Sequence, residues 1–156
     1  MAIQIEKEFD VPETVEEVWA FLTDPSRIVS CLPGATLLDA IDDRTFRGRI
    51  GMKLGPVGTM FDGVIRFDEL DPEDHHVVMT GEGKDEKGVG SVKMTMTSNL
   101  TPAEEGGTHV WVSQTVSLQG RLASFGRGGV IQSLADIVFG RFTACVKSKL
   151  AGESGD

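Results

Sequence analysis

The fold of this chain is decided by residues 120–150, GRLASFGRGGVIQSLADIVFGRFTACVKSKL. Apolar side chains recur there at every fourth position, which predicts one long helix with a wide apolar face. The face consists of Leu134, Val138, Phe142, Val146 and Leu150, with Ile131, Ile137 and Cys145 beside it. A long helix that packs on a sheet can close a hydrophobic core or enclose a cavity, and the residues leave both alternatives open.

The segment before this helix has the period-two alternation of β-strands. A first strand is predicted at residues 2–9, and two short helices follow it at residues 12–24 and 25–31. The first of these helices is expected to bury Val15, Val18, Trp19 and Leu22. Six more strands are predicted at residues 36–42, 45–53, 58–69, 75–83, 88–100 and 108–119. Short turn-rich connections make neighbouring strands antiparallel, so the order predicts an α+β fold with helices on one side of a strongly curved, seven-stranded sheet.

Alternation also assigns one face of these strands to the interior. The expected inward residues are Phe46, Gly48, Ile50, Met52, Phe61, Gly63, Ile65, Phe67, Val92, Met94, Met96, Ser98, Leu100, Val110, Val112, Gln114, Val116 and Leu118. Glycine is unusual inside a strand, where it marks a bend or a place that something else fills. Methionine is an adaptable filler that suits both ordinary cores and surfaces for variable apolar partners. The pattern therefore leaves a packed core and a ligand cavity as equal alternatives.

Composition limits the function classes. The 156 residues predict a single domain at 1–150 with a short polar tail at 151–156. A net charge of −9 argues against nonspecific nucleic-acid binding, which needs clustered Lys and Arg. Cys31 and Cys145 have apolar neighbours and no metal-binding spacing, so they are expected to be buried, reduced thiols. Residues 1–11 alternate like a strand and lack the apolar region of a signal peptide, and the cytoplasm follows as the default location.

Few residues suggest catalysis. His75 and His76 are adjacent and would point to opposite faces of a strand, and no metal-ligand spacing or nucleotide-binding motif occurs. Glu82 lies between two glycines and is the best candidate for a carboxylate inside a cavity, although a solvated strand charge is the more ordinary interpretation. Gln114 is an amide on an apolar face and needs a hydrogen-bond partner, which could be backbone, water or a ligand carbonyl. Ser98 and Ser124 are weaker cases of the same kind.

The start of the long helical stretch is rich in glycine. Three glycines within residues 126–129 disfavour a helix by about 1 kcal/mol each. The segment is either a gate over a cavity mouth or an ordinary loop before a later helix start. In the gate hypothesis Phe125 is the blocking side chain, and Arg121 and Arg127 make the local surface basic.

Several of these pieces resemble the CoxG family, which takes its name from the G subunit of carbon monoxide dehydrogenase, within the START-like, helix-grip (SRPBCC) superfamily. They are residues 32–35 (LPGA), 53–63 (KLGPVGTMFDG), 81–83 (GEG) and 120–126 (GRLASFG). The order and spacing of the pieces hold over nearly the whole chain. The resemblance implies a seven-stranded antiparallel sheet wrapped around the C-terminal helix, with a hydrophobic cavity between them.

The resemblance also implies a function. Proteins of this family are similar in role to accessory factors of molybdenum-containing CO dehydrogenases, and they are not catalytic components. The expected ligand is an isoprenoid quinone such as a menaquinone, or another lipid, with no covalent cofactor. The expected partners are a molybdenum hydroxylase-type dehydrogenase and the inner face of the cell membrane, and not nucleic acid. The alternative is a protein-binding assembly factor with an incidental cavity, and a small helix-grip enzyme is a third, weaker alternative.

In this hypothesis the ligand cavity has a defined lining and a gate. The lining residues are Phe46, Ile50, Met52, Phe61, Gly63, Ile65, Met79, Met94, Met96, Val112, Gln114, Val116, Leu118, Leu122, Phe125, Leu134, Val138 and Phe142. The gate residues are Ser124, Phe125, Gly126 and Arg127. Gln114, Ser124 and Arg127 are the expected partners of the ligand's head group. No catalytic residue and no metal ligand is expected.

Overall fold

The structure is a computed structural model that describes residues 2–54, 57–88, 90–126 and 129–154. It confirms the predicted α+β class. The elements in chain order are β1 (Ala2–Val11), α1 (Val15–Leu22), α2 (Pro25–Ser30), β2 (Ala35–Ala40), β3 (Thr45–Leu54), β4 (Val57–Asp71), β5 (His76–Asp85), β6 (Gly90–Pro102), β7 (Thr108–Gly120), the 3-10 helix η1 (Arg121–Gly126) and α3 (Val130–Ser154).

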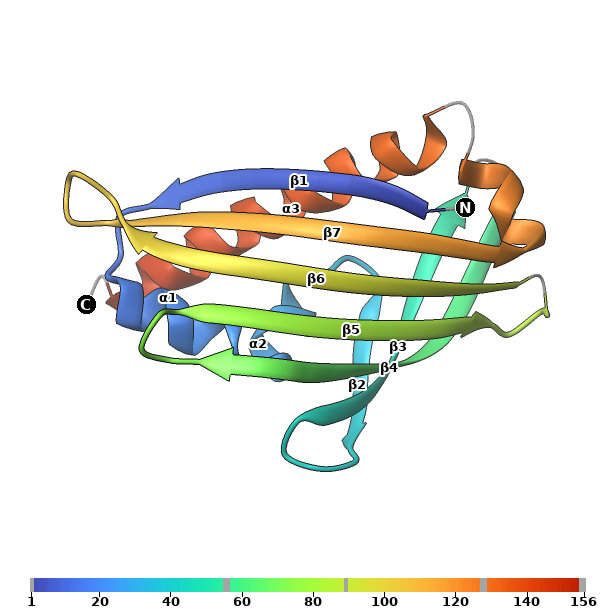
Figure 1. The fold of residues 1–156 in the computed structure, drawn as a ribbon, viewed down its shortest axis with the longest axis horizontal. Coiled ribbons are helices and arrows are strands. Elements are labelled where there is room, and N and C mark those ends of the chain that lie inside the picture. Colours follow the sequence, from blue (N-terminus) through green and yellow to red (C-terminus); the bar gives the residue numbers. More distant parts are fainter. Residues whose placement is uncertain (1, 55–56, 89, 127–128, 155–156) are drawn as a thin grey trace.

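The strands form one seven-stranded sheet in the order β1-β7-β6-β5-β4-β3-β2, and every neighbouring pair is antiparallel. The sheet curves, and α1, α2 and α3 lie on its concave side (Figure 1). α3 passes behind β1 and β7, close to one edge of the sheet (Figure 1). The predicted single helical stretch is divided, since residues 121–126 form η1 and only the part from Val130 onward is α-helical.

Two glycines are required by the close approach of neighbouring strands. Gly48 and Gly63 are direct cross-strand partners in β3 and β4. A Cβ atom on Gly63 would lie 2.6 Å from the carbonyl oxygen of Glu82, and one on Gly48 would lie 2.9 Å from the carbonyl oxygen of Thr36. These contacts are too short for a side chain, so the two glycines serve the backbone of the curved sheet rather than leaving room for something else.

Gly63→Ala is expected to lower the free energy of unfolding by about 1–3 kcal/mol, because the methyl group must push two strands apart. Gly81→Ala is the matched control. Its Cβ would make only ordinary contacts, the nearest of them at 3.5 Å from the flexible end of Met94. Urea unfolding of the two variants should therefore separate them, with Gly81→Ala neutral or up to about 1 kcal/mol more stable than the wild type. Equal destabilisation by both substitutions would contradict this account.

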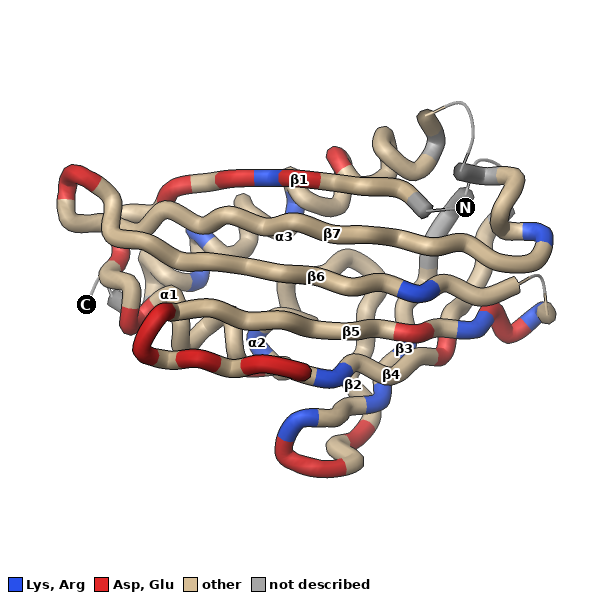
Figure 2. Tube along the Cα trace, viewed as in Figure 1, with Lys and Arg blue, Asp and Glu red and all other residues tan. Residues whose placement is uncertain are grey.

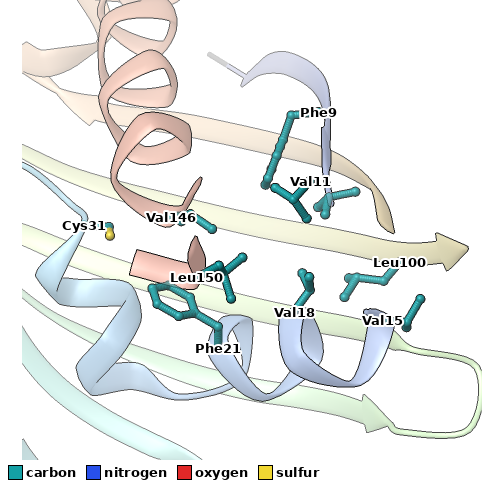
Figure 3. Packing of buried hydrophobic residues seen from close by; sticks show 10 residues of the cluster. Phe9, Val11, Val15, Val18, Phe21, Cys31, Leu100, Val146 and Leu150 are labelled. Carbon is teal, nitrogen blue, oxygen red and sulfur yellow. The ribbon is translucent and has the colours of Figure 1, made fainter. Parts of the chain in front are cut away.

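Among the described residues, the buried apolar side chains form three clusters rather than one. The first joins α1, β1 and the C-terminal part of α3 (Figure 3); its buried members are Phe9, Val11, Val15, Val18, Phe21, Cys31, Leu100, Val110, Val146 and Leu150. The second lies near the start of α3 and contains Ile3, Phe61, Leu118, Leu122 and Ile131. The third contains Phe67, Val77 and Met79 on β4 and β5.

Two burial predictions need correction. Ile137 was expected beside the apolar face of the long helix, but its side chain is 56% exposed. The predicted burial is wrong because the strip of the α3 surface that packs against the protein is narrower than the apolar pattern suggests. In α1 the buried aromatic residue is Phe21, which is fully covered, whereas Trp19 and Leu22 are only half-buried.

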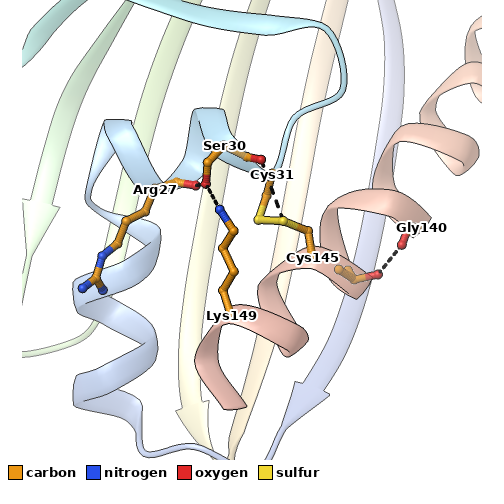
Figure 4. Close-up of a disulfide and its surroundings, with 7 residues drawn as sticks. Arg27, Ser30, Cys31, Gly140, Cys145 and Lys149 are labelled. Atoms are coloured by element: carbon orange, nitrogen blue, oxygen red, sulfur yellow. Dashed lines mark hydrogen bonds between the residues drawn. A yellow bond between two sulfur atoms is a disulfide. The ribbon is translucent and has the colours of Figure 1, made fainter. Parts of the chain in front are cut away.

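The cysteines also differ from expectation. Cys31 and Cys145 form a disulfide across 114 residues, with their Cα atoms 5.4 Å apart (Figure 4). The prediction of reduced thiols is wrong because tertiary structure brings the C-cap of α2 against α3, a contact that sequence spacing does not reveal. Within the described part of the chain, no helix has both the length and the apolar character needed to cross a membrane.

Candidate functional site

The concave face of the sheet carries the residues that the sequence assigned to the interior. At its two ends these side chains are buried within the first and second clusters. Between the ends, Phe67 and Met79 are buried in the third cluster, and most of the other side chains are only half-buried. The half-buried residues are Phe46, Ile50, Ile65, Met94, Met96, Val112, Gln114, Val116, Leu134, Val138 and Phe142. The chain's own packing therefore covers these side chains of the concave face only in part.

The position of α3 explains this incomplete cover. α3 packs against the β1 edge, where the rings of Phe9 and Phe139 meet edge to face with centroids 5.7 Å apart. Lys7 on β1 also forms an ion pair with Asp136 on α3. The closest backbone approaches of α3 are to β1, η1 and α1, and not to the middle strands. The helix therefore closes the β1 side and leaves β3 to β5 facing the interior at greater distance.

The predicted lining residues are distributed over all three clusters. Phe61, Leu118 and Leu122 are in the second cluster, with Ile50, Val116 and Leu134 packed against it. Met79 is in the third cluster, with Phe46, Ile65, Met94 and Met96 around it. Val112 and Phe142 pack against the first cluster. Gln114 and Val138 belong to none of them. The side chains of Met52 and Phe125 and the whole of Arg127 lie outside the described residues, and Gly126 is the last residue of η1.

Gln114 has an apolar environment. It lies in the middle of β7, where its cross-strand partners are Ile5 on β1 and Met96 on β6. The neighbours on its own face, Val112 and Val116, are apolar as well. Its side chain is half-buried and makes no hydrogen bond to any other described residue. The amide can both donate and accept, so its hydrogen-bonding capacity is open to water or to a ligand.

The two serines are already hydrogen-bonded. Ser98 is buried, and its hydroxyl donates to the backbone carbonyl of Trp111 at 2.9 Å. Ser124 is exposed, and its hydroxyl donates to the carbonyl of Arg121 at 2.9 Å within η1. Neither hydroxyl needs a ligand. Among the candidate polar partners with described side chains, Gln114 is therefore the one on the concave face with unused capacity.

Glu82 is not a cavity carboxylate. It lies on the outer face of β5, where its side chain is exposed and pairs with Lys93 at 3.3 Å. The flanking glycines do not turn it inward because its position follows the ordinary alternation of the strand. The inward carboxylate on β5 is instead Asp85, which is 5% exposed and is the register partner of Phe61. Its spacing from Val77, Met79 and Gly81 was the signal in the sequence that could have identified it.

His76 and His109 lie away from the concave surface. The His109 ring is 2.7 Å from Asp10 through Nδ1 and 3.1 Å from Glu8 through Nε2, on the outer face of β1 and β7. These two carboxylates raise the pKa of His109 above its ordinary value, the hydrogen bond to Asp10 being the larger cause. His75 packs edge to face against Trp19, and His76 contacts Asn99. Within the described ranges, no group of His, Cys, Asp and Glu could hold a metal ion.

His109→Gln is expected to reduce stability more at pH 6 than at pH 9. The pKa of His109 is raised by folding, so its contribution is present below the unfolded pKa and is lost as the pH rises through the folded pKa. Solvent exposure keeps the effect small. Urea unfolding of the wild type and the variant at both pH values measures it. A stability difference that is the same at pH 6 and pH 9 would show that the ion pairs contribute nothing.

A hollow lies on the outer face of the sheet, opposite to the concave face. It is a groove of about 800 Å³ that crosses β3 to β6, and charged side chains line it. Arg49 pairs with Asp62 and Lys93 with Glu82 there, and all four side chains are exposed. Figure 2 shows that both signs of charge gather over these strands, whereas the middle of β6 and β7 carries little charge. No pattern in the sequence indicates this groove, because it depends on how far the sheet bends.

Comparison with known families identifies the chain. The family model of CoxG, the carbon monoxide dehydrogenase G subunit, matches residues 8–151, which span the sheet from β1 to most of α3. The chain belongs to the CoxG family. The resemblance noted in the sequence is thereby confirmed. No curated protein sequence matches the chain.

Solved structures confirm that this CoxG protein has the START-like fold. A conserved protein from Geobacillus kaustophilus is similar with a TM-score of 0.84 and 22% identity, covering 96% of each chain. A START superfamily protein from Mycobacterium smegmatis is similar with a TM-score of 0.63 and 12% identity, covering 97% of this chain and 99% of its own. The Zhui aromatase/cyclase from Streptomyces sp. R1128 has a TM-score of 0.61 and 12% identity, covering 98% and 93%. At these identities the likeness shows the fold alone.

Proposed function

We propose that this CoxG protein is a noncatalytic carrier of an uncharged, long apolar ligand, and that the ligand is an isoprenoid quinone. The carrier acts as an accessory factor of a molybdenum CO dehydrogenase-type enzyme in the cytoplasm, with peripheral contact to the inner face of the membrane. The half-buried apolar surface between α3 and the middle strands carries this proposal. Family membership supports the accessory role.

The driving force for binding is burial of apolar area. A ligand tail that covers the half-buried side chains removes both its own surface and theirs from water. Burial contributes about 25 cal/mol per Å², so about 200 Å² of newly buried surface would contribute about 5 kcal/mol. Methionines at positions 79, 94 and 96 are among the side chains that would contact the tail, and their flexibility suits ligands of variable length.

Gln114 is the proposed polar anchor. Gln114 lies in the middle of β7, and its cross-strand partners Ile5 and Met96 are apolar. A ligand carbonyl can accept a hydrogen bond from the amide group, whereas a charged head group would find no opposite charge beside Gln114 among its described neighbours. This arrangement favours a quinone or another neutral carbonyl compound over a fatty acid.

The placement of the histidines supports a carrier over an enzyme. General acid–base catalysis needs a titratable group within reach of the substrate. His109 lies on the outer face of the sheet and is engaged by Asp10 and Glu8. The aromatase/cyclase with the same fold is an enzyme by its name, so the fold by itself does not decide between the two roles.

The carrier is tested by extracting the purified protein with organic solvent and identifying the extract by mass spectrometry. We expect a quinone in near-stoichiometric amount, and titration of the stripped protein with a short-chain isoprenoid quinone should give saturable binding. Absence of lipid in the extract together with no binding in the titration would reject the proposal. Turnover of the bound compound would instead support an enzyme.

Gln114→Leu is expected to weaken quinone binding by about tenfold, since the lost hydrogen bond corresponds to about 1–1.5 kcal/mol. Binding of a hydrocarbon of similar length should change little or improve, because leucine keeps the surface apolar. Tryptophan fluorescence titration measures both ligands. If the quinone and the hydrocarbon lose affinity equally, Gln114 is not the anchor.

The charged outer groove favours one alternative, a protein-binding assembly factor. In that case charge reversal in the groove, as in Lys93→Glu with Arg49→Glu, should abolish co-purification with the dehydrogenase. Quinone binding should remain unchanged, because the groove lies on the opposite face of the sheet. Gel filtration of the mixed proteins shows whether the complex with the dehydrogenase and the bound quinone are retained. If the charge-reversed variant keeps both, the groove is not the binding surface for the dehydrogenase.

A further inference from the structure

The disulfide joins two elements that have little other contact. Cys31 is the C-cap residue of α2 and lies just before edge strand β2, while Cys145 lies on α3 (Figure 4). α2 has six residues, none of which is buried. Beside the disulfide, Lys149 Nζ donates a hydrogen bond of 2.6 Å to Ser30 Oγ, and Cys145 Sγ lies 3.9 Å from the carbonyl oxygen of Ser30. The covalent bond is therefore the main connection between α2 and α3.

The disulfide lies on the opposite side of α3 from the contacts that this helix makes with β1. The sheet ends at β1 on one edge and at β2 on the other. At the β1 edge, α3 is held by the Phe9–Phe139 contact and by the ion pair of Lys7 with Asp136. At the β2 edge, the link runs through α2 and the disulfide. The apolar concave surface lies between these two attachments, so the disulfide closes one of its sides.

Breaking the bond would not release α3 from the rest of the protein. Val146 and Leu150 are fully or almost fully buried in the first cluster and hold the C-terminal part of the helix to α1 (Figure 3). Cys31 also belongs to that cluster, at 4% exposure. Reduction would leave the helix in place and remove the covalent constraint on α2 and β2 alone. The disulfide thus constrains α2 and β2, while the apolar cluster holds α3. A local switch requires this separation of roles.

We propose that the Cys31–Cys145 disulfide is a redox modification site that works as a clasp over the ligand surface. In the oxidised state it holds α2 and β2 against α3 and slows ligand exchange. In the reduced state α2 and β2 separate more readily from α3 and exchange is fast. This regulation rests on the ligand-binding function proposed above. In a cytoplasmic protein, a disulfide is more often a redox sensor than a permanent staple.

The chemistry is a two-electron thiol–disulfide exchange with a dithiol reductant. A thiolate of the reductant attacks Sγ of Cys145, the less buried of the two cysteine residues, and the S–S bond breaks with Cys31 leaving as a thiolate that takes up a proton. The second thiol of the reductant then displaces Cys145, so the protein gains two hydrogens and the reductant becomes a disulfide. Cys145 Sγ lies 3.9 Å from the carbonyl oxygen of Ser30, which can accept a hydrogen bond from the new thiol.

The test compares the air-oxidised full chain with the chain reduced by dithiothreitol. Mass spectrometry and thiol titration assign the redox state. The dissociation rate of the apolar fluorophore N-phenyl-1-naphthylamine reports ligand exchange, and hydrogen–deuterium exchange over residues 25–40 reports the clasp directly. We expect reduction to raise the dissociation rate about tenfold and to leave the association rate almost unchanged. Exchange over residues 25–40 should increase while that of residues 146–150 stays low.

Two variants sharpen the comparison. Cys145→Ser should behave like the reduced wild type and should not respond to dithiothreitol. Lys149→Met removes the hydrogen bond to Ser30 but keeps the disulfide, so its dissociation rate should stay close to that of the oxidised wild type.

Three results would overturn the clasp: two free thiols after air oxidation, equal exchange over residues 25–40 in both redox states, or global unfolding on reduction. Failure of the fluorophore to bind in either state would instead reject the proposed function, and hydrogen–deuterium exchange would then decide the clasp alone.

Discussion

Phe21→Ala is expected to destabilise the protein by about 3–5 kcal/mol, the largest loss that we predict for a single substitution. Phe21 is fully buried in the first cluster, where α1 meets the end of α3. Removing the ring leaves a cavity between two elements that are fixed by other contacts and cannot close it. Urea unfolding, with the disulfide kept oxidised in both proteins, measures the change.

Ile137→Ala is the control for this prediction. Ile137 is a large apolar residue on α3 that the sequence pattern placed beside the buried face, but the structure leaves it 56% exposed. Its truncation should change stability by no more than about 0.5 kcal/mol. If Ile137→Ala costs as much as Phe21→Ala, the orientation of α3 in the structure is wrong.

Gly81→Leu is expected to lower the affinity for a quinone by about a hundredfold, because the new side chain would occupy space that the ligand needs. Gly81 is half-buried on β5, and its Cβ would point between Met94 and Ile65 on the concave face without a backbone clash. Fluorescence titration with a short-chain isoprenoid quinone measures the loss. The urea midpoint of the variant should stay close to that of the wild type.

Gly81→Ala is the matched control, since a methyl group at the same position makes only ordinary contacts. It should bind the quinone within about threefold of the wild type. Gly63→Leu would be a poor test of the cavity because its Cβ would clash with the carbonyl oxygen of Glu82 and disturb the sheet. Full affinity in Gly81→Leu would place the ligand elsewhere.

The strands and their faces were predictable because the signal is local. Alternation in residues 45–53 and 108–119 indicated both the strands and the inward sides, and β3 and β7 begin where predicted and end one residue later. The short turns indicated the antiparallel order. The helical period of residues 130–150 predicted α3, although it could not show that the helix packs mainly along β1 and leaves Ile137 in solvent.

The candidate site was predictable in part. Alternation placed Gln114, Met94 and Met96 on one face, and cross-strand register then brought Gln114 and Met96 side by side. The cavity and its gate remain predictions, and the gate segment lies largely outside the described residues. The prediction that Glu82 is a cavity carboxylate was wrong, because its side chain follows the alternation of β5 and lies on the outer face despite the flanking glycines. The outer groove was missed, since no local pattern records how far a sheet bends.

The sequence by itself determined the strands, their inward faces and the long helix, because each follows from a periodicity between neighbouring residues. Only the tertiary structure decided three features that join distant segments. These are the pairing of Cys31 with Cys145, the close strand approach that requires Gly63, and the division of the core into three clusters around a half-buried apolar surface. Each depends on distances between residues far apart in the chain, which are set by how the helices settle on a curved sheet.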